Sequence, residues 1–472
     1  MLGRTRHVHF VGIGGIGMSG IAELLANLGY AVSGSDQAAS ATLEHLRALG
    51  VTAAVGHEAA NLGDADVVVY SSAVRIDNPE ILEARRRGVP VVSRAEMLAE
   101  LMRLRVGIAV AGAHGKTSTT SMVALVLERA GLDPTAVIGG RLSAFGSNAR
   151  LGHGQYMVAE ADESDRSFLK LSPTVAVVTN IDREHMEAYG GFDDLQQAFV
   201  DFANKVPFYG AVVACADDPE LARVLPRLTR RVTTYGIDSA DALVRAVDLT
   251  LEGFGSACTV ETRDRRDRQA RATPLGRLQL QVPGRHSVLN ALAAVAVGLE
   301  LGVPFDVVAG ALGEFSGAER RFQIRGTVHG ITVVDDYGHH PTEIAAVLDA
   351  ARAAAPSRVV VAFQPHRYSR TAQLLPDFAA VLASADEVVL TDIYAASEAP
   401  IPGVTVEALA EAVNRRRAHP STVVKRLDAL AGTVADLARP GDLVITLGAG
   451  SIGAVAPALV QELTRRYPET AS

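Results

Sequence analysis

"GAHGKT", residues 112–117, stands between an apolar run, Val106–Ala111, and a helical pattern that extends to about Ala130. A glycine-rich loop between a strand and a helix presents backbone amides to a polyphosphate. Lys116 can neutralise the β and γ phosphates, and the hydroxyl of Thr117 can hold Mg²⁺. The stretch therefore predicts an ATP-binding loop. Its predicted members are Gly112, Ala113, His114, Gly115, Lys116, Thr117 and Ser118.

The loop is shorter than a standard phosphate-binding loop. The residue five positions before Gly115 is Val110, where the standard pattern has glycine. This spacing would be a defect in a motor ATPase. Glycine, lysine and threonine between a strand and a helix nevertheless indicate phosphate binding.

Short apolar runs alternate with helical patterns on both sides of the loop, which predicts parallel sheets covered by helices. Among the expected strands are Val67–Tyr70, Val106–Ala111, Ala211–Cys215 and Glu387–Leu390. A chain of 472 residues exceeds the roughly 250–300 residues that one core supports. We therefore predict an α/β protein of three domains. These are an N-terminal Rossmann-like domain at residues 1–105, a central domain with a P-loop-type mononucleotide-binding sheet at 106–315, and a C-terminal Rossmann-like domain at 316–472.

Composition and charge exclude several classes of protein. The net charge is −8, and the basic residues are spread along the chain, which argues against a nucleic acid partner. No stretch of 18 apolar residues without charge occurs, so we expect no membrane insertion. The two cysteines, Cys215 and Cys258, are far apart and lie in apolar runs, as expected in the reducing cytoplasm. Glycines and Glu23 interrupt the N-terminal apolar run, which therefore predicts a strand, a turn and a helix rather than a signal peptide.

A second glycine cluster, GIGGIG at residues 12–17, follows the first predicted strand, and Asp36 ends the next one. Glycines at such a turn let amides approach a pyrophosphate, and the acid can bind a ribose hydroxyl. Taken alone, the pattern predicts an NAD enzyme. The same physics serves any nucleoside diphosphate, including a UDP-sugar, and a tight turn without a ligand is a third interpretation.

Acidic residues gather where two later strands are expected to end. VAEADESD places Glu160 after the run Tyr156–Ala159, and TNIDREHM places His185 after the run Val175–Thr179. An acid at a strand end beside a phosphate-binding loop is suited to hold magnesium. Glu160 is therefore a candidate magnesium ligand, whereas a solvated loop explains the three acids after it equally well. His185 either binds a metal or caps a helix.

Three polar clusters lie near the expected strands of the last domain. They are RRF from Arg320, DDYGHHPTE from Asp335 and FQPHRYSR from Phe363. Ligand-binding residues concentrate in such loops. Adjacent arginines also form surface salt bridges, but the two histidines and the last basic run are harder to explain by packing. Arg367 and Arg370 offer guanidinium forks for a carboxylate or a phosphate.

Taken together, these motifs resemble those of the Mur ligase family over nearly the whole chain. Nine stretches occur in the order of the family: GIGGIGMSGIAE, SGSD, GAHGKTST, EADESDRSFL, TNIDREHM, PGRHSVLNALAA, RRF, DDYGHHPTE and FQPHRYSR. One match would be weak, but nine in order are highly specific. The short spacing of the phosphate loop is what this resemblance implies.

The resemblance implies a role for each group of residues. It implies that the first domain binds a UDP-sugar through Gly14, Gly15, Ile16, Asp36, His57 and Ser72. It implies magnesium ligands at Thr117, Glu160 and His185, and further ATP-site residues at His286, Asn290 and Arg321. The incoming amino acid is expected at Tyr337, His339, Arg367 and Arg370. Catalytic roles are expected for Lys116, His185, Arg321 and His339.

Two positions depart from patterns found in the family. Ser287 follows His286 where asparagine is common, so an amide contact there is lost or replaced by a hydroxyl. Several members carry a carbamylated lysine after the HM segment, but residues 195–202 contain no lysine, and Lys205 lies beyond them. We therefore predict no carbamyl-lysine.

Within the family, the motifs are most similar to those of members that join L-alanine to UDP-N-acetylmuramate. The resemblance implies an ATP-dependent ligase that needs Mg²⁺, forms an acyl phosphate and makes a peptidoglycan precursor. The expected partners are UDP-N-acetylmuramate and L-alanine, and the expected form is a cytoplasmic monomer or homodimer. A sister ligase that attaches a preformed peptide in cell-wall recycling is the nearest alternative. An NAD-dependent oxidoreductase and a regulatory P-loop ATPase are more distant ones.

Overall fold

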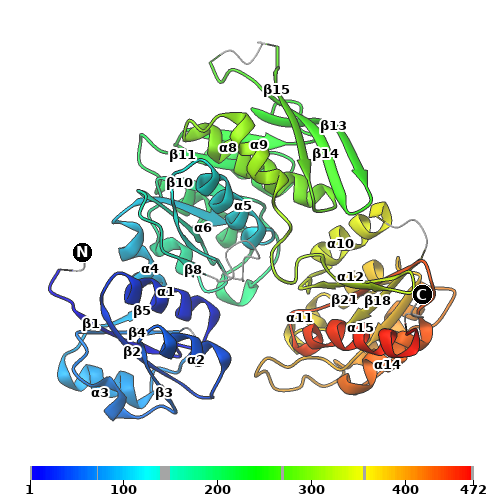
Figure 1. Cartoon of the computed structure of the whole chain (residues 1–472), viewed down its shortest axis with the longest axis horizontal. Helices are drawn as coiled ribbons and strands as arrows, with labels where there is room; N and C mark the ends of the chain where they lie inside the picture. The colour runs from blue at the N-terminus through cyan, green and yellow to red at the C-terminus, as the bar shows by residue number, and fades with distance from the viewer. Residues whose placement is uncertain (1–2, 72, 139–148, 267–270, 355–357, 469–472) are drawn as a thin grey trace. The chain divides into compact units, whose positions relative to one another are not determined.

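The computed structural model describes residues 3–71, 73–138, 149–266, 271–354 and 358–468. The chain divides into two compact units. The first contains Met1–Val247, Thr259–Leu278 and Leu289–Phe315, and the second contains Asp248–Cys258, Gln279–Val288 and Ser316–Ser472. Three β-sheets, each accompanied by helices, can be followed along the chain in Figure 1.

The N-terminal sheet has five parallel strands in the order β3-β2-β1-β4-β5. They are β1 (His7–Val11), β2 (Ala31–Asp36), β3 (Thr52–Val55), β4 (Val67–Tyr70) and β5 (Val91–Ser93). The helical elements are α1 (Ile16–Asn27), α2 (Ala41–Ala48), η1 (Ala59–Leu62), α3 (Pro79–Arg87) and α4 (Arg94–Met102). The strand order reverses beside β1, so the glycine turn after β1 lies at the switch point, where open α/β sheets bind ligands.

The central sheet has ten strands in the order β15-β14-β13-β12-β11-β10-β6-β9-β7-β8. They are β6 (Val106–Ala111), β7 (Thr135–Val137), β8 (Ala149–Arg150), β9 (Tyr156–Glu160), β10 (Val175–Val178), β11 (Ala211–Cys215), β12 (Val232–Gly236), β13 (Val244–Glu252), β14 (Gly255–Thr262) and β15 (Thr273–Leu280). The helical elements are α5 (Lys116–Arg129), η2 (Ser167–Lys170), η3 (Met186–Ala188), α6 (Phe192–Asn204), α7 (Pro219–Val224), η4 (Leu225–Arg227), α8 (Arg285–Glu300) and α9 (Phe305–Gly313). Because β6 pairs in parallel with both β10 and β9, the loops after these three strands meet at one edge.

The C-terminal sheet has six strands in the order β16-β17-β21-β18-β19-β20, and all its pairs are parallel except β16 with β17. They are β16 (Gln323–Val328), β17 (Ile331–Asp336), β18 (Arg358–Phe363), β19 (Glu387–Leu390), β20 (Thr422–Val423) and β21 (Asp442–Leu447). The helical elements are α10 (Pro341–Ala354), α11 (Tyr368–Gln373), α12 (Leu375–Leu382), α13 (Val406–Asn414), α14 (Leu427–Leu437), η5 (Ser451–Ala454) and α15 (Val455–Arg466).

Burial explains why the central strands of these sheets are continuously apolar. Every residue of β10, β11 and β21 is buried, as expected where helices cover both faces of a parallel sheet. In the C-terminal unit, one apolar cluster contains Val359, Val361 and Phe363, and a second contains the intervening Val360 and Ala362. Alternate residues of β18 thus fill the cores on the two faces of its sheet.

The predicted fold class is confirmed, with one parallel-stranded sheet in the N-terminal part, a large central sheet and a mainly parallel C-terminal sheet. The bounds of four strands, β4, β6, β11 and β19, are those expected from the sequence. Among the described strands, six are not expected from the sequence, namely β3, β7, β8, β12, β16 and β20. The domain boundaries at 105/106 and 315/316 remain predictions. None of the described helices is long and apolar enough to cross a membrane.

Candidate ATP and substrate sites

The loop after β6 adopts a backbone that favours glycine at two positions. Gly112 has a φ of 134° and Gly115 a φ of 80°, and side chains rarely adopt such angles without strain. A Cβ atom at Gly112 would overlap the hydroxyl of Thr179. Gly115 is the N-cap of α5, so the loop leads into the positive end of a helix. This backbone is suited to cradle an anion.

Two residues after β10 fix the shape of the loop through the backbone of His114. Thr179 Oγ1 donates a hydrogen bond to the His114 carbonyl at 2.6 Å. The Asn180 side chain accepts from the His114 amide at 2.8 Å and donates to its carbonyl at 3.0 Å. Neither residue is among the predicted site residues, because the contact requires β10 to lie beside β6.

Asn290, a predicted ATP-site residue on α8, lies against the same loop. Its Oδ1 accepts a hydrogen bond from Thr119 Oγ1 at 3.2 Å. The same oxygen would lie 2.5 Å from a Cβ atom built on Gly115. The close approach of Asn290 to the loop therefore depends on the absence of a side chain at position 115.

The ammonium group of Lys116 is held in place by the loop and by one carboxylate. Its Nζ donates to the Gly112 carbonyl at 2.7 Å and to the Glu163 carboxylate at 2.8 and 2.9 Å. Burial alone would lower the pKa of Lys116, but Glu163 and Asp162 outweigh it and raise the pKa above its ordinary value. The cation is therefore charged and lies against the carbonyl oxygens of the loop, at Gly112 and Ala113.

The sequence allows the acids after Glu160 to form a solvated loop, but the structure buries one of them. Glu163 is only 1% exposed, and its backbone carbonyl accepts a hydrogen bond from Tyr189 Oη at 2.5 Å. Burial raises the pKa of Glu163 to about 7, and the charge of Lys116 limits that rise. Asp162 instead forms an ion pair with Arg94 of α4 at 3.2 Å. A solvated loop accordingly does not describe Glu163.

The surroundings of His185 bear on its two predicted roles, which are to bind a metal or to cap a helix. It occupies the N-cap position of η3, but its side chain makes no capping hydrogen bond. Its backbone has a φ of 54°, a strained conformation of the kind that clusters at functional sites. Glu163, Glu184 and His185 each offer one ligand atom, and these atoms lie within 4.8 Å of one another. Two buried carboxylates and an imidazole fit a divalent cation.

The other predicted magnesium ligands lie at the same edge of the central sheet. Thr117, the last residue of GAHGKT, is in the first turn of α5. Glu160 is the last residue of β9, the strand that pairs with β6 on the side away from β10. Both residues remain predicted ligands. Glu163 and Glu184 join them as candidates that only the folded chain reveals, because their burial cannot be read from an acidic run.

The GIGGIG turn is closed by the predicted ribose-binding acid. Asp36 Oδ2 accepts a hydrogen bond from the Gly14 amide at 2.8 Å, and Gly15 is the N-cap of α1. A Cβ atom at Gly14 would lie 2.8 Å from that carboxylate, so the close contact requires glycine. His57 follows β3, the neighbour of β2 in the sheet. Of the remaining predicted UDP-sugar residues, Ser72 lies outside the described residues, as does the side chain of Ile16.

In the C-terminal unit, one carboxylate joins two predicted catalytic residues. Glu343 accepts a hydrogen bond from Arg321 Nη1 at 3.2 Å and from the amide of His339 at 3.0 Å. The guanidinium carbon of Arg321 lies 5.2 Å from the centre of the Tyr337 ring. Arg320 pairs instead with the fully buried Asp335 at 3.2 Å. The two adjacent arginines are thus ion-paired in different places, with their side chains largely buried.

The predicted amino-acid site includes an aromatic pair beside Arg367. The rings of His366 and Tyr394 are stacked, with centres 5.6 Å apart and planes 11° from parallel. The Arg367 amide donates to the Tyr394 carbonyl at 2.9 Å, and the φ of Arg367 is 69°. Arg370 lies one turn further, in α11. Burial lowers the pKa of His366 to about 3, helped by His339 and the two arginines, so a neutral ring adjoins the cationic pair.

Ser287, which departs from the family pattern, makes a hydrogen bond at the start of α8. The Ser287 hydroxyl donates a hydrogen bond to the Pro283 carbonyl at 2.7 Å, four residues earlier in the chain. A hydroxyl at this position therefore fastens the start of the helix to its own backbone. Next to it, burial lowers the pKa of His286 to about 4, and the charge of Arg321 adds to this effect.

His286 is expected to make stability fall as the pH is lowered. Its pKa in the folded chain, about 4, lies below the ordinary 6.5, so between these values the unfolded chain binds the extra proton. The stabilisation is complete above pH 6.5 and is lost as the pH falls toward 4. Thermal unfolding of the wild type and His286→Gln, without ligand, should show the wild type losing its advantage across this window. A constant difference between the two melting temperatures from pH 7 to pH 4 would contradict the prediction.

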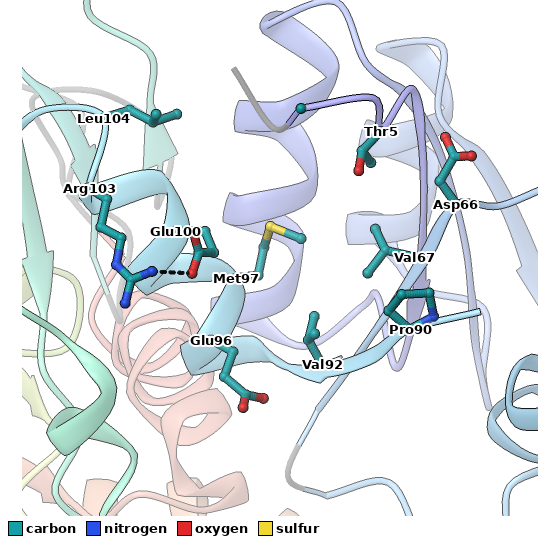
Figure 2. A pocket seen from close by; sticks show the side chains of 11 residues that line it. Thr5, Asp66, Val67, Pro90, Val92, Glu96, Met97, Glu100, Arg103 and Leu104 are labelled. Atoms are coloured by element: carbon teal, nitrogen blue, oxygen red, sulfur yellow. Dashed lines mark hydrogen bonds and ion pairs between the residues drawn. The ribbon is translucent and has the colours of Figure 1, made fainter. Parts of the chain in front are cut away.

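A separate cavity of about 530 Å³ lies on the N-terminal part of the chain and holds none of the predicted site residues. Figure 2 shows its lining side chains, which include Val67 at the start of β4, Val92 of β5 and Met97 of α4. The acids that line it already have partners, since Asp66 accepts from the amides of Arg6 and His7, Glu96 accepts from the amide of Ser93, and Glu100 pairs with Arg103. The cavity therefore adds no ligand group to the candidate sites.

Comparisons with known proteins match nearly the whole chain to one family. The model of the Mur ligase family catalytic domain matches residues 7–105, that of the Mur ligase middle domain residues 110–298, and that of the Mur ligase glutamate ligase domain residues 320–450. A UDP-N-acetylmuramate–L-alanine ligase of Trichlorobacter lovleyi is 54% identical over 465 residues, which are 98% of this chain and 100% of that protein. The chain belongs to the Mur ligase family. The ligase of the same name from Anaeromyxobacter dehalogenans is also 54% identical, over 98% of this chain and 99% of that one.

Solved structures of Mur ligases share the fold of this Mur ligase. The crystal structure of a UDP-N-acetylmuramate-alanine ligase from Thermotoga maritima matches with a TM-score of 0.81 and 31% identity, covering 98% of this chain and 99% of that one. A murein peptide ligase from Psychrobacter arcticus matches with a TM-score of 0.69 and 25% identity, over 97% and 98% of the two chains. The predicted family is confirmed, and this chain is an enzyme of the ligase class.

Proposed function

We propose that this Mur ligase joins L-alanine to the lactyl carboxylate of UDP-N-acetylmuramate and converts ATP to ADP and phosphate. The main support is full-length similarity to relatives that carry this activity in their names, at 52–54% identity. The glycine loop with its positioned lysine supports the ATP part of the proposal. The pair Arg367 and Arg370 supports the amino-acid part, because guanidinium groups bind carboxylates with two parallel hydrogen bonds.

The first step activates the carboxylate. Amide formation from a free carboxylate is uphill, so one carboxylate oxygen attacks the γ-phosphorus of ATP, the bond to the β-phosphate oxygen breaks, and an acyl phosphate forms. Lys116 and the loop amides stabilise the negative charge on the transferring oxygens. His185, with either Glu163 and Glu184 or the predicted ligands Thr117 and Glu160, would hold Mg²⁺, which would further neutralise that charge.

The second step forms the amide. Arg367 and Arg370 hold the alanine carboxylate, and the alanine ammonium group must lose a proton before its amine can attack the acyl carbon. The tetrahedral intermediate then expels phosphate. The neutral ring of His366 adjoins the two arginines without adding a charge that would repel an ammonium group.

Phosphate release measured across a panel of amino acids, with UDP-N-acetylmuramate and ATP present, tests the proposed function. Release is expected with L-alanine and is expected to need all three substrates. Release with an L-Ala-D-Glu-containing tripeptide, and none with L-alanine, would instead assign the recycling activity. Release that needs no amino acid would assign an ATPase.

Arg367→Ala is expected to raise the KM for L-alanine at least tenfold while changing the KM for ATP less than twofold, because it removes a charge-assisted contact to the alanine carboxylate. Steady-state phosphate release at varied alanine and varied ATP measures both constants. Arg415→Ala, at the exposed end of α13, is a matched control that should change neither. Equal increases in the two KM values would show that Arg367 serves a phosphate.

We also propose a cytoplasmic location. Within the described residues, neither Cys215 nor Cys258 is in a disulfide and both are buried, in agreement with a reducing compartment. The protein is proposed to be a monomer or a homodimer. Sedimentation velocity of the purified chain distinguishes these two states.

A further inference from the structure

A carboxylate with no exposed surface lies against the N-terminal sheet and accepts hydrogen bonds from four residues. Glu80, in the first turn of α3, is 0% exposed. Its Oε2 accepts from His9 of β1 at 3.0 Å and from Ser35 of β2 at 2.6 Å. Its Oε1 accepts from the Glu58 amide at 3.1 Å and from Asn61 Nδ2 of η1 at 2.9 Å.

These donors keep Glu80 ionised despite its burial. Burial alone would raise the pKa of Glu80, but hydrogen bonds from His9, Ser35 and Asn61 outweigh it and lower the pKa below its ordinary value. An ionised carboxylate accepts hydrogen bonds and donates none. Every group that contacts Glu80 at hydrogen-bond distance must therefore point a hydrogen toward it.

This requirement fixes the proton on a neighbouring histidine. Because the Ser35 hydroxyl donates its one hydrogen to Glu80, its oxygen can only accept a hydrogen bond from His57 Nδ1, which lies 2.8 Å away. Nδ1 of His57 also lies 3.6 Å from Glu80 Oε1, which favours a proton there. A neutral His57 protonated at Nδ1 carries its lone pair on Nε2.

Nε2 of His57 is the ring atom that remains for a ligand. The described residues place no hydrogen-bond partner at Nε2, and this atom is not sealed from solvent. Gly56, the residue before His57, donates from its amide to the carbonyl of Asp36 at 2.8 Å. Asp36 in turn closes the GIGGIG turn, so His57 belongs to the same sheet edge as the predicted nucleotide site.

We propose that Glu80 and Ser35 are positioning residues for nucleotide recognition: they hold His57 with its proton on Nδ1, so that Nε2 accepts a hydrogen bond from an N–H or O–H donor of the UDP group. The proposal rests on the proposed function, because it takes UDP-N-acetylmuramate as the ligand. It assigns chemistry to two residues that never touch the substrate. A nucleotide offers such donors at uracil N3 and at the ribose hydroxyls.

A double-mutant cycle separates positioning from ordinary structural support. The dissociation constant of UDP-N-acetylmuramate is measured by calorimetry, without ATP, for wild type, Ser35→Ala, His57→Ala and the double variant. Ser35→Ala and His57→Ala are each expected to weaken binding about threefold to tenfold, the equivalent of one hydrogen bond. The double variant is expected to bind no more weakly than His57→Ala. Independent effects that multiply in the double variant would overturn the proposal.

Ser33→Ala is the matched control. Ser33 lies two residues earlier on β2 and also bridges two imidazoles, His7 at 2.8 Å and His9 at 2.8 Å, but it does not contact His57. It is expected to lower the melting temperature about as much as Ser35→Ala and to leave the dissociation constant unchanged. Equal losses of affinity in both serine variants would show a structural role for Ser35. Glu80→Gln, if it folds, should repeat the result of Ser35→Ala.

Nucleotide analogues identify the donor that faces Nε2. UDP, 3-methyl-UDP, 2′-deoxy-UDP and 3′-deoxy-UDP are titrated into wild type and His57→Ala. One analogue is expected to bind the wild type more weakly than UDP does. The same analogue and UDP are expected to bind His57→Ala with equal affinity. If every analogue that binds the wild type more weakly than UDP also binds His57→Ala more weakly than UDP, Nε2 is not the acceptor. If the wild type binds neither UDP nor UDP-N-acetylmuramate, the proposed function fails, a result distinct from both outcomes above.

Discussion

Lys116→Ala is expected to lower alanine-dependent phosphate release by a factor of about 10²–10³ while leaving the affinity for UDP-N-acetylmuramate nearly unchanged. The ammonium group lies against the loop, 2.7 Å from the Gly112 carbonyl, and its charge is maintained by Glu163. Its removal takes away a contact that strengthens as charge spreads over the transferring phosphate. The GIGGIG turn, which lies on a different sheet, keeps its geometry.

Two measurements check this prediction. Phosphate release with all three substrates gives the rate, and calorimetry without ATP gives the affinity for the UDP-sugar. Lys205→Ala, at the exposed end of α6, is the control and should retain the wild-type rate. Release by Lys116→Ala above a hundredth of the wild-type rate would defeat the assignment of Lys116 to phosphate transfer.

Much of the fold could be predicted because apolar runs of the right length coincide with buried parallel strands. The run Val106–Ala111 is one example, since five of its six residues are buried in β6. Strand β3 is different: its four residues, Thr52–Val55, read TAAV, and only one of them is buried. Strand β16 contains Arg325 and Gly326 and pairs at the antiparallel edge of its sheet. Edge strands of this kind bury too little to show a strand pattern.

The candidate site could be predicted only where a residue and its motif adjoin in sequence. The glycine loop and Lys116 can be recognised from six residues. Thr179 and Asn180 reach the same loop from 65 and 66 residues away, and their contacts depend on the order of strands in the sheet. The burial of Glu163 has the same origin. The order of parallel strands in a sheet depends on packing between distant segments, which is difficult to predict from a single sequence.

Gly112→Ala is expected to reduce kcat/KM for ATP at least a hundredfold. Two effects act together: a φ of 134° strains any side chain, and the new Cβ would overlap the Thr179 hydroxyl. The backbone N and O of Asn180 lie 3.1 Å from the same Cβ position, so the loop cannot shift toward them. Relief requires the loop to move away from β10, and a displacement of about 1 Å at a reacting group costs about 10² in rate.

Gly131→Ala separates the two effects. Gly131 has a φ of 72° but open space around the added Cβ, so this variant carries backbone strain without overlap, at the far end of α5. It is expected to lower the melting temperature and to leave the kinetics of ATP unchanged, whereas Gly112→Ala should lose activity even at temperatures where it is fully folded. Circular dichroism melts and phosphate release at varied ATP provide both comparisons. If the two variants lose stability equally and Gly112→Ala keeps its kcat/KM for ATP, the contacts of the loop with Thr179 and Asn180 have no part in binding phosphate.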